Sequence, residues 1–372
     1  MQTLNQVFTG LSKSAIADLL LAKSAMTAHY LLGGTRVKGM ARAFRAGAAT
    51  IATHNIVGVG IDEKYVEGVP TGVAAIKFLV RSKIPASALT AKIKLPTSID
   101  GLPTDVEEVG LIVPLSKAVN STKKTKGTAT SAAAMPNPRL KHRPAHPGSS
   151  VGFREPNDEF IMAGTFGALV KDAKGKTYIL SNNHVLAFEN GIDANGTKRE
   201  ALPAGSPIYQ PGFLDNGDVD TDAIAELTRW VDLRADKNDN LVDGAIARLT
   251  KANLADKNIH FIGPPTGSKM AEKDMIVHKF GRTTSYRAGR VSSVFFDVTV
   301  PYEVGDVVFI DQIAIRGLNG KKFSDSGDSG SVILERATNK AVGLLFAGAT
   351  TGNLTFGNHI SDVLKQLKVR LA

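Results

Sequence analysis

The chain has 372 residues, of which 43% are hydrophobic and 22% charged, a composition typical of a soluble globular protein with two or three domains. It contains no cysteine, which excludes a disulfide scaffold, a cysteine nucleophile and a thiolate metal site. The net charge is +10, and the excess lies in residues 1–150. Charge of this kind can attract nucleic acid, but the segment lacks the interleaved aromatic side chains of a base-stacking surface. We therefore expect a basic linker and solvated basic faces, and no nucleic acid partner.

Residues 1–45 are predicted to be helical, because apolar side chains recur there at spacings of three and four and Gly33-Gly34 would end the pattern. We expect this segment to pack on the following domain, with an oligomer contact as the alternative. Asp18 and Lys23 interrupt its apolar stretch, so neither a signal peptide nor a transmembrane helix is expected. Together with the missing cysteines, this predicts a cytoplasmic protein that does not contact a membrane.

Two further segments precede the long C-terminal part. Residues 46–115 are predicted to form a small α+β module, with β-rich runs at 56–62 and 73–80. Residues 116–148 are rich in Lys, Ser, Ala and Pro and are predicted to be a flexible basic linker. Residues 1–115 are candidates for binding a regulatory partner or a second copy of the chain. The histidines of these segments are expected to be structural, and no metal site is predicted: His54, His142 and His146.

Residues 149–372 have a different pattern. Short apolar runs such as TFGALV, VSSVFFDVTV and AVGLLFAG alternate with Gly, Asn and Asp. This spacing predicts an all-β barrel or sandwich. The ending HISDVLKQLKVRL has apolar residues at i, i+3, i+4 and i+7, which predicts a C-terminal helix over about 360–371.

The run SDSGDSGS occupies residues 324–331. Gly, Asp and Ser are ordinary turn residues, so a solvated turn is one interpretation. The alternative is a loop that presents Ser329 as a nucleophile, since flanking glycines let successive backbone N–H groups converge. In that case the N–H groups of Gly327 and Ser329 would form an oxyanion hole.

A serine nucleophile needs a base and a carboxylate that orients the base. His184 follows a polar corner after an apolar strand in YILSNNHVLA and is the candidate base. Asp243, in NLVDGAIARL, has apolar flanks and needs a buried partner. Asp222 is a rival carboxylate in an acidic loop that loosely resembles a calcium loop, but that loop lacks the Gly and the closing Glu of such a site.

The order His184, Asp243, Ser329 resembles that of the trypsin-like (chymotrypsin-fold) serine peptidases. The runs KFGRTTSYRAGRV (279–291) and AVGLLFAG (341–348) are similar to the hairpin that opens the second barrel in that family and to the strand that lines its specificity pocket. A narrower resemblance, carried by NIVGVGIDEK, IDGLPTDVEEVG and YILSNNHVLA, is to bacterial relatives of the plant NARROW LEAF 1 peptidases. It favours Asp243 over Asp222.

The resemblance implies a mainly β, double-barrel peptidase domain over 149–372, with barrel one at about 149–265 and barrel two at about 266–359. The specificity pocket would be formed by Phe323, Ser324, Phe346, Ala347 and Gly348. Phe323 stands where trypsin has an acid, which predicts cleavage after apolar or small residues.

The expected function is a serine endopeptidase that acts on protein or peptide substrates through Ser329, His184 and Asp243, without a metal or organic cofactor. The position that often supplies a serine to the triad carboxylate is Phe346 here, which leaves the orientation of His184 to other groups. The alternative is a catalytically silent scaffold with the same fold, with or without nucleic acid contact through its basic N-terminal part.

Overall fold

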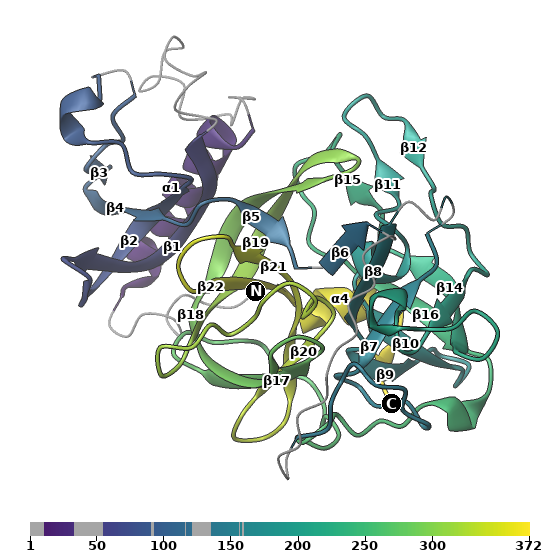
Figure 1. Ribbon diagram of the computed structural model, residues 1–372. Coiled ribbons are helices and arrows are strands. Elements are labelled where there is room, and N and C mark those ends of the chain that lie inside the picture. Colours follow the sequence, from purple (N-terminus) through teal and green to yellow (C-terminus); the bar gives the residue numbers. More distant parts are fainter. Residues whose placement is uncertain are drawn as a thin grey trace.

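The computed structural model describes residues 11–32, 55–90, 93–115, 117–120, 135–155, 157 and 160–372. It is mainly β, with two large β units and a smaller N-terminal module beside the second of them (Figure 1). The expected fold class, a double β-barrel with a C-terminal helix and a helical and α+β N-terminal part, is confirmed. The domain boundaries inferred from the sequence stay predictions.

Barrel two is a closed ring of six antiparallel strands in the order β17-β20-β21-β22-β19-β18, which closes because β18 also pairs with β17. Its strands are β17 (Ile276–Gly281), β18 (Ser285–Tyr302), β19 (Gly305–Gly317), β20 (Val332–Glu335), β21 (Ala341–Ala349) and β22 (Leu354–His359). Apolar side chains of alternating strand positions fill the interior, as the period of two requires.

Barrel one is built on the strand path β23-β9-β10-β16-β14-β13-β7-β8-β6. Its strands are β6 (Lys117–Asn120), β7 (Ser150–Phe153), β8 (Phe160–Thr165), β9 (Ala168–Lys171), β10 (Thr177–Ser181), β13 (Pro207–Tyr209), β14 (Ala223–Trp230), β16 (Ala245–Leu249) and β23 (Arg370–Leu371). Strands β8 and β9 lie near opposite ends of this path, yet two residues join them, a span of roughly 11 Å at most. The sheet must therefore curl round on itself.

Three short strands and three 3₁₀ turns lie outside these two barrels' main strands. The strands β11 (Gly191–Ile192), β12 (Lys198–Arg199) and β15 (Leu233–Arg234) form a small separate sheet. The turns are η2 (Ala86–Ala88), η3 (Phe213–Asp215) and η4 (Ala252–Leu254).

The N-terminal module continues the sheet of barrel two. Strand β1 (Ile56–Val66) pairs antiparallel with β18, and β2 (Val69–Val80), β4 (Leu102–Glu108) and β3 (Ser98–Ile99) follow in that order. Helix α1 (Lys13–Tyr30) packs on β1 and β2. Its buried Lys23 forms ion pairs with Asp297 (2.5 Å) and Asp311 (2.7 Å) of barrel two. The module thus shares both a sheet and a buried charge cluster with that barrel.

Two described parts of residues 116–148 differ from the expected flexible linker. Residues 117–120 form β6, which pairs antiparallel with β8. Residues 135–148 lie on barrel one, where Ala145 donates its N–H to Leu254 and is fully buried. Residues 121–134 lie outside the described residues. The C-terminal helix α4 (Ile360–Gln366) is shorter than expected, because residues 370–371 instead form β23 on β9 of barrel one.

Candidate active site

His184 lies at the end of strand β10, in the short helix α3 (Asn183–Leu186). The polar residues around it, Ser181 to Asn183, are buried. The side-chain amide of Asn183 is hydrogen-bonded: its Nδ2 donates to the carbonyls of Asn190 and Val231, both at 2.7 Å. Val185 and Leu186 hold the turn in the core of barrel one. The imidazole of His184 is therefore fixed at a barrel end and is only 1% exposed.

Asp243, fully buried just before β16, is the partner of this imidazole. Its Oδ2 contacts His184 Nδ1 in a short hydrogen bond and accepts a second from the Tyr302 hydroxyl at 2.8 Å. Its Oδ1 accepts from the backbone N–H of Asn183 at 2.7 Å and of His184 at 3.3 Å. The Asn358 side-chain oxygen accepts a hydrogen bond from the backbone N–H of Asp243 at 3.0 Å. A carboxylate held by this many donors is fixed in position and can hold one ring orientation of the histidine.

The hydroxyl of Tyr302 supplies the hydrogen bond that the sequence left unassigned. Tyr302 comes from the end of β18 in barrel two, so the carboxylate of barrel one is held partly by the other barrel. Burial, followed by the charge of Asp243, raises the pKa of Tyr302 well above its ordinary value. The phenol therefore stays protonated and acts as a donor.

The rival carboxylate Asp222 lies in a different set of contacts. It pairs with Lys141 at 2.5 Å and with Arg143 at 3.3 Å, and it accepts the backbone N–H of Asp218 at 3.0 Å. These contacts attach residues 141–143 to barrel one. The structure therefore brings Asp243, not Asp222, to His184.

The loop with Ser329 is held from inside the protein by Asp328. This carboxylate is fully buried, pairs with Lys279 at 3.1 Å, and accepts hydrogen bonds from the backbone N–H groups of Thr283 (2.9 Å) and Thr284 (3.1 Å). Burial by itself would raise the pKa of Asp328, but the Lys279 charge and the hydrogen bonds outweigh it and lower that pKa below its usual value. The loop is thus fixed by a permanent buried charge.

Strand β8 brings the histidine turn and the serine loop together. The Thr165 N–H donates to the Ser329 carbonyl at 2.8 Å. A Cβ at the preceding Gly164 would lie 2.5 Å from the Val185 side chain and 3.2 Å from the same Ser329 carbonyl. Val185, next to His184, and the backbone of Ser329 therefore both pack against Gly164. A larger residue at this position would push the two loops apart.

The Ser329 hydroxyl donates to the Phe346 carbonyl at 3.0 Å. His184 Nε2 is buried and has no hydrogen-bond partner among the described residues. An unpaired buried nitrogen costs about 1–3 kcal/mol. A hydrogen-bond donor placed at Nε2 would remove that cost.

The backbone N–H groups of Gly327 and Ser329 converge on a single oxygen, the carbonyl of Leu115. The Gly327 N–H forms a short hydrogen bond with it, and the Ser329 N–H lies 3.4 Å from it. Gly327 has φ +101°, and a Cβ there would lie 2.3 Å from Thr283 Oγ1. Only a glycine fits this conformation and this approach. Two donors aimed at one carbonyl oxygen are the arrangement expected of an oxyanion hole.

The predicted pocket residues separate into two groups. Ser324 and Gly348 line a small pocket together with Thr355 and Leu115, and about 30 Å³ of free space remains in it, enough for little more than a water molecule. The other three do not line it: Phe323 lies in the core of barrel two, the Phe346 ring packs on Phe309 at 4.8 Å, and Ala347 pairs with Pro114.

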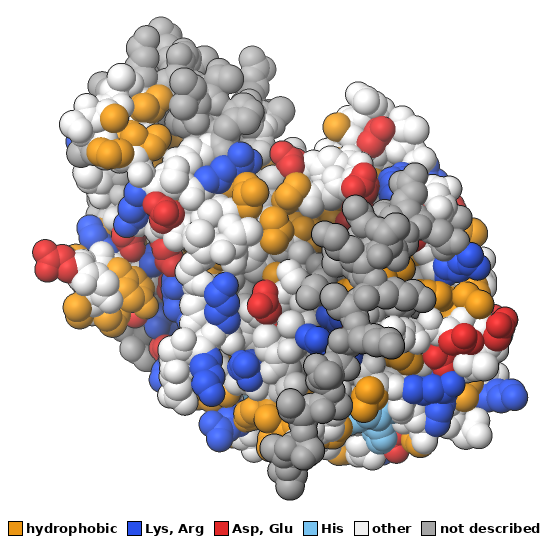
Figure 2. All heavy atoms as spheres, in the orientation of Figure 1, with side chains coloured by type: hydrophobic (Ala, Val, Ile, Leu, Met, Phe, Trp, Pro, Cys, Tyr) orange, Lys and Arg blue, Asp and Glu red, His pale blue; other side chains and the backbone are white. Residues whose placement is uncertain are grey.

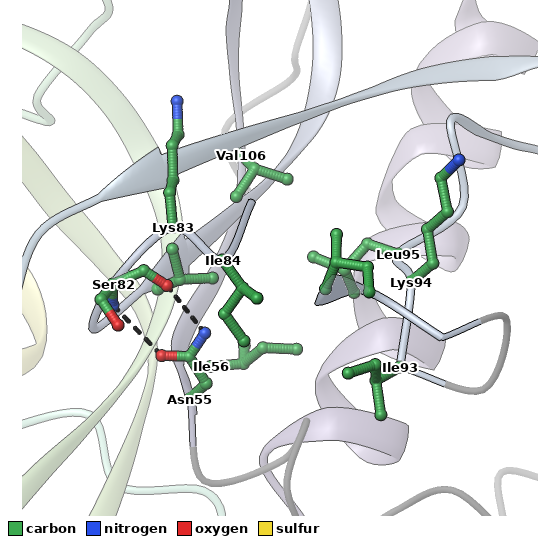
Figure 3. A pocket seen from close by; sticks show the side chains of 11 residues that line it. Asn55, Ile56, Ser82, Lys83, Ile84, Ile93, Lys94, Leu95 and Val106 are labelled. Carbon is green, nitrogen blue, oxygen red and sulfur yellow. Dashed lines mark hydrogen bonds between the residues drawn. The ribbon is translucent and has the colours of Figure 1, made fainter. Parts of the chain in front are cut away.

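A second, larger pocket lies in the N-terminal module (Figure 3). It has a volume of about 260 Å³ and an apolar lining that includes Ile56, Ile84 and Leu95, with a pair of hydrogen bonds between Asn55 and Ser82 at its edge. It contains none of the predicted site residues. Residues 91–92, beside it in sequence, lie outside the described part.

The remaining expectations concern metals, membranes and nucleic acid. Within the described ranges, no group of three or more His, Asp or Glu side chains could hold a metal ion, and no helix is long and apolar enough to cross a bilayer. On the face in Figure 2, Lys and Arg side chains are dispersed, with Asp and Glu among them. His54 lies outside the described residues, whereas His142 and His146 pack against His260, at 4.7 and 4.9 Å between ring centroids.

Sequence reasoning missed several of these positions. Tyr302 and Asn358 stand in ordinary β-strand patterns with no local signal. Lys279 and Thr284 belong to the run 279–291 that was singled out, but their role as partners of Asp328 becomes visible only when barrel two closes. Leu115 had no signal at all, because it is an apolar residue at the end of a short strand.

Solved structures with a similar fold are chymotrypsin-like serine proteases. They include Thermobifida fusca protease A (18% identity, TM-score 0.41), Nocardiopsis protease (16%, 0.41) and a Cellulomonas bogoriensis chymotrypsin (16%, 0.38). Each comparison covers 61% of this chain and 97% of the other. No protein-family model and no curated protein matches the sequence. At these identities and TM-scores the likeness carries no statement about activity, which must be argued from the site itself.

Proposed function

We propose that this chain is a serine endopeptidase in which Ser329 is the nucleophile, His184 the general base and acid, and Asp243 the group that orients and charge-stabilises the imidazole. The observation that carries the proposal is the convergence of the Gly327 and Ser329 N–H groups on one carbonyl oxygen, beside a buried His–Asp pair. A packing role could explain the buried His–Asp pair alone, or the tight glycine turn alone. It does not explain why the two features occur together beside Ser329.

Each group has a defined task in this mechanism. The Ser329 hydroxyl turns from the Phe346 carbonyl to His184 Nε2, gives up its proton and attacks the scissile carbonyl. The Gly327 and Ser329 N–H groups stabilise the negative oxygen that forms. His184 then returns the proton to the leaving amine, and water hydrolyses the acyl-enzyme. The Tyr302 and backbone donors hold the Asp243 carboxylate in place throughout.

A fluorophosphonate probe tests the proposal directly. The wild-type protein should be labelled at Ser329, Ser329→Ala should not be labelled, and His184→Ala should lose nearly all labelling. Ser331→Ala is the matched control, since Ser331 lies in the same loop and its hydroxyl donates to the Asp328 carbonyl at 2.6 Å. Equal labelling of wild type and Ser329→Ala would exclude Ser329 as the nucleophile.

The scaffold alternative has one observation in its favour: the Ser329 hydroxyl and His184 Nε2 are not hydrogen-bonded to each other. A folded wild-type protein that no variant or condition makes reactive to the probe would support it. The likeness to bacterial relatives of the NARROW LEAF 1 peptidases rests on sequence segments and stays a proposal, as does a cytoplasmic location.

A further inference from the structure

The segment that supplies the carbonyl oxygen to the candidate oxyanion hole is part of this chain. Strand β5 (Ile112–Pro114) leaves the N-terminal module and pairs antiparallel with the end of β21 in barrel two. Val113 lies opposite Gly348 in this ladder, and Leu115, the next residue after β5, donates its N–H to the Phe346 carbonyl at 3.1 Å. In Figure 1, β5 lies between the N-terminal module and barrel one, beside the strands of barrel two.

Leu115 occupies the small pocket. Its side chain is 6% exposed, belongs to the apolar cluster that contains Phe323, and lies 2.9 Å from the place where a Cβ on Gly348 would stand. The pocket is lined mainly by small and polar residues, among them Ser324, Gly348 and Thr355, and the charged residues Lys322 and Asp325 also line it. The packing of Leu115 shows that a γ-branched apolar side chain fits here.

Beyond Leu115 the chain continues on the other barrel. Residues 117–120 form β6, which pairs antiparallel with β8, with Lys117 opposite Ala163. Strand β8 also carries Thr165, whose N–H holds the Ser329 carbonyl. The described residues on the two sides of position 116 therefore lie on different barrels, 112–115 on barrel two and 117–120 on barrel one. The Leu115 carbonyl lies between the two halves, at Ser329.

The nucleophile is next to this carbonyl. The Phe346 carbonyl oxygen is 3.0 Å from Ser329 Oγ and 3.1 Å from Leu115 N, and the Ser329 N–H lies 3.4 Å from Leu115 O. An extended strand with its carbonyl oxygen in the donor pair and its side chain in the pocket is in the orientation of a bound substrate. We propose that Ile112–Leu115 is an internal substrate and that the chain cleaves itself after Leu115, an inference that rests on the proposed peptidase function.

The step balances without any group beyond water. Ser329 Oγ adds to the Leu115 carbonyl carbon while its proton passes to His184 Nε2. The bond from that carbon to the nitrogen of Ser116 breaks as His184 returns the proton to the amine. Water then hydrolyses the ester, which leaves a Leu115 carboxylate, a new amino terminus at Ser116 and a free Ser329 hydroxyl.

The two pieces should remain together after cleavage. The N-terminal piece stays attached through the β1–β18 ladder and the ion pairs of Lys23 with Asp297 and Asp311. Because it stays attached, residues 112–115 remain beside the pocket and compete with other substrates. The same contacts keep the segment in its own cleft, so the cleavage is intramolecular and its rate is independent of protein concentration.

Intact-mass measurement over time tests the inference. Wild type should convert to pieces 1–115 and 116–372, whereas Ser329→Ala should stay at full length, also when it is mixed with wild type. Leu115→Asp should slow cleavage at this bond at least tenfold, because a carboxylate would have to be buried where the leucine packs, in a pocket that Asp325 also lines. Leu111→Asp is the matched control: Leu111 directly precedes this segment, is 39% exposed and should leave the cleavage rate unchanged.

A fluorogenic peptide with leucine before the cleaved bond separates the two possible failures. Leu115→Asp, whose cleft is vacated, should hydrolyse it several-fold faster than wild type. Hydrolysis of the peptide by wild type that itself stays at full length, or cuts itself at another bond, would overturn the internal substrate and leave the peptidase intact. No hydrolysis and no fluorophosphonate labelling in either protein would overturn both.

Discussion

The hydroxyl of Tyr302 is the most specific element of the site that the structure adds, and Tyr302→Phe removes it with almost no change of shape. The hydroxyl donates to Asp243 Oδ2 at 2.8 Å, and both residues are buried. A hydrogen bond to a charged group contributes about 1.5–3 kcal/mol. We therefore expect the free energy of unfolding to fall by about that amount, and the Tm by several degrees.

The same loss should affect turnover. Without the phenol, Asp243 Oδ2 keeps only its bond to His184 among the described partners, so the imidazole is less firmly oriented. If half of the interaction energy is expressed in the transition state, kcat falls by a factor of about 4 to 13. KM should change little, because Tyr302 does not line the pocket.

Two measurements check this prediction. Thermal unfolding is compared in the Ser329→Ala background, where self-cleavage cannot interfere, and peptide hydrolysis is compared with Ser329 present. Tyr286→Phe is the control, since Tyr286 lies on the same strand β18 and packs by its ring on Phe261 at 5.2 Å. If Tyr302→Phe and Tyr286→Phe have equal Tm and equal kcat, the Tyr302 hydroxyl does not hold the carboxylate.

Three further changes probe other parts of the structure. Lys279→Met leaves the buried carboxylate of Asp328 without its cation and should lower the free energy of unfolding by about 3–5 kcal/mol, whereas adding Asp328→Asn should recover part of it; additive losses in urea unfolding would contradict the pairing. Burial and two neighbouring histidines lower the pKa of His260 to about 4. Between about pH 6.5 and 4 the unfolded chain therefore binds a proton that the folded protein does not. The free energy of unfolding should fall by roughly 1–2 kcal/mol as the pH decreases through this range. His260→Phe should flatten this slope, and an unchanged pH dependence of the Tm would assign the slope to other groups. Gly348→Val would place side-chain atoms where Leu115 now lies and should shift peptide cleavage from leucine toward alanine, as a peptide library would report; an unchanged preference would mean that this pocket does not select the residue.

Local chemistry made part of the site predictable. The glycines around Ser329 need a positive φ or a close approach, and Gly327 and Gly330 have φ +101° and +92°. Asp243 stands between apolar residues and so needed a buried partner, which the structure supplies with His184. Such signals are readable in a sequence because each depends on a residue and its immediate neighbours.

The tertiary structure decided the rest. Tyr302, 59 residues from Asp243 in the chain, reaches its carboxylate only because barrel two closes and docks on barrel one. Residues 117–120 of the expected linker form β6 on β8, and β5, at the end of the preceding module, pairs with the end of β21. Composition does not reveal such backbone partners, because they come from strands distant in the chain. Sequence patterns indicate which side chains favour burial and which residues favour an unusual backbone conformation. Pairings between distant strands are set by the packing of the whole chain.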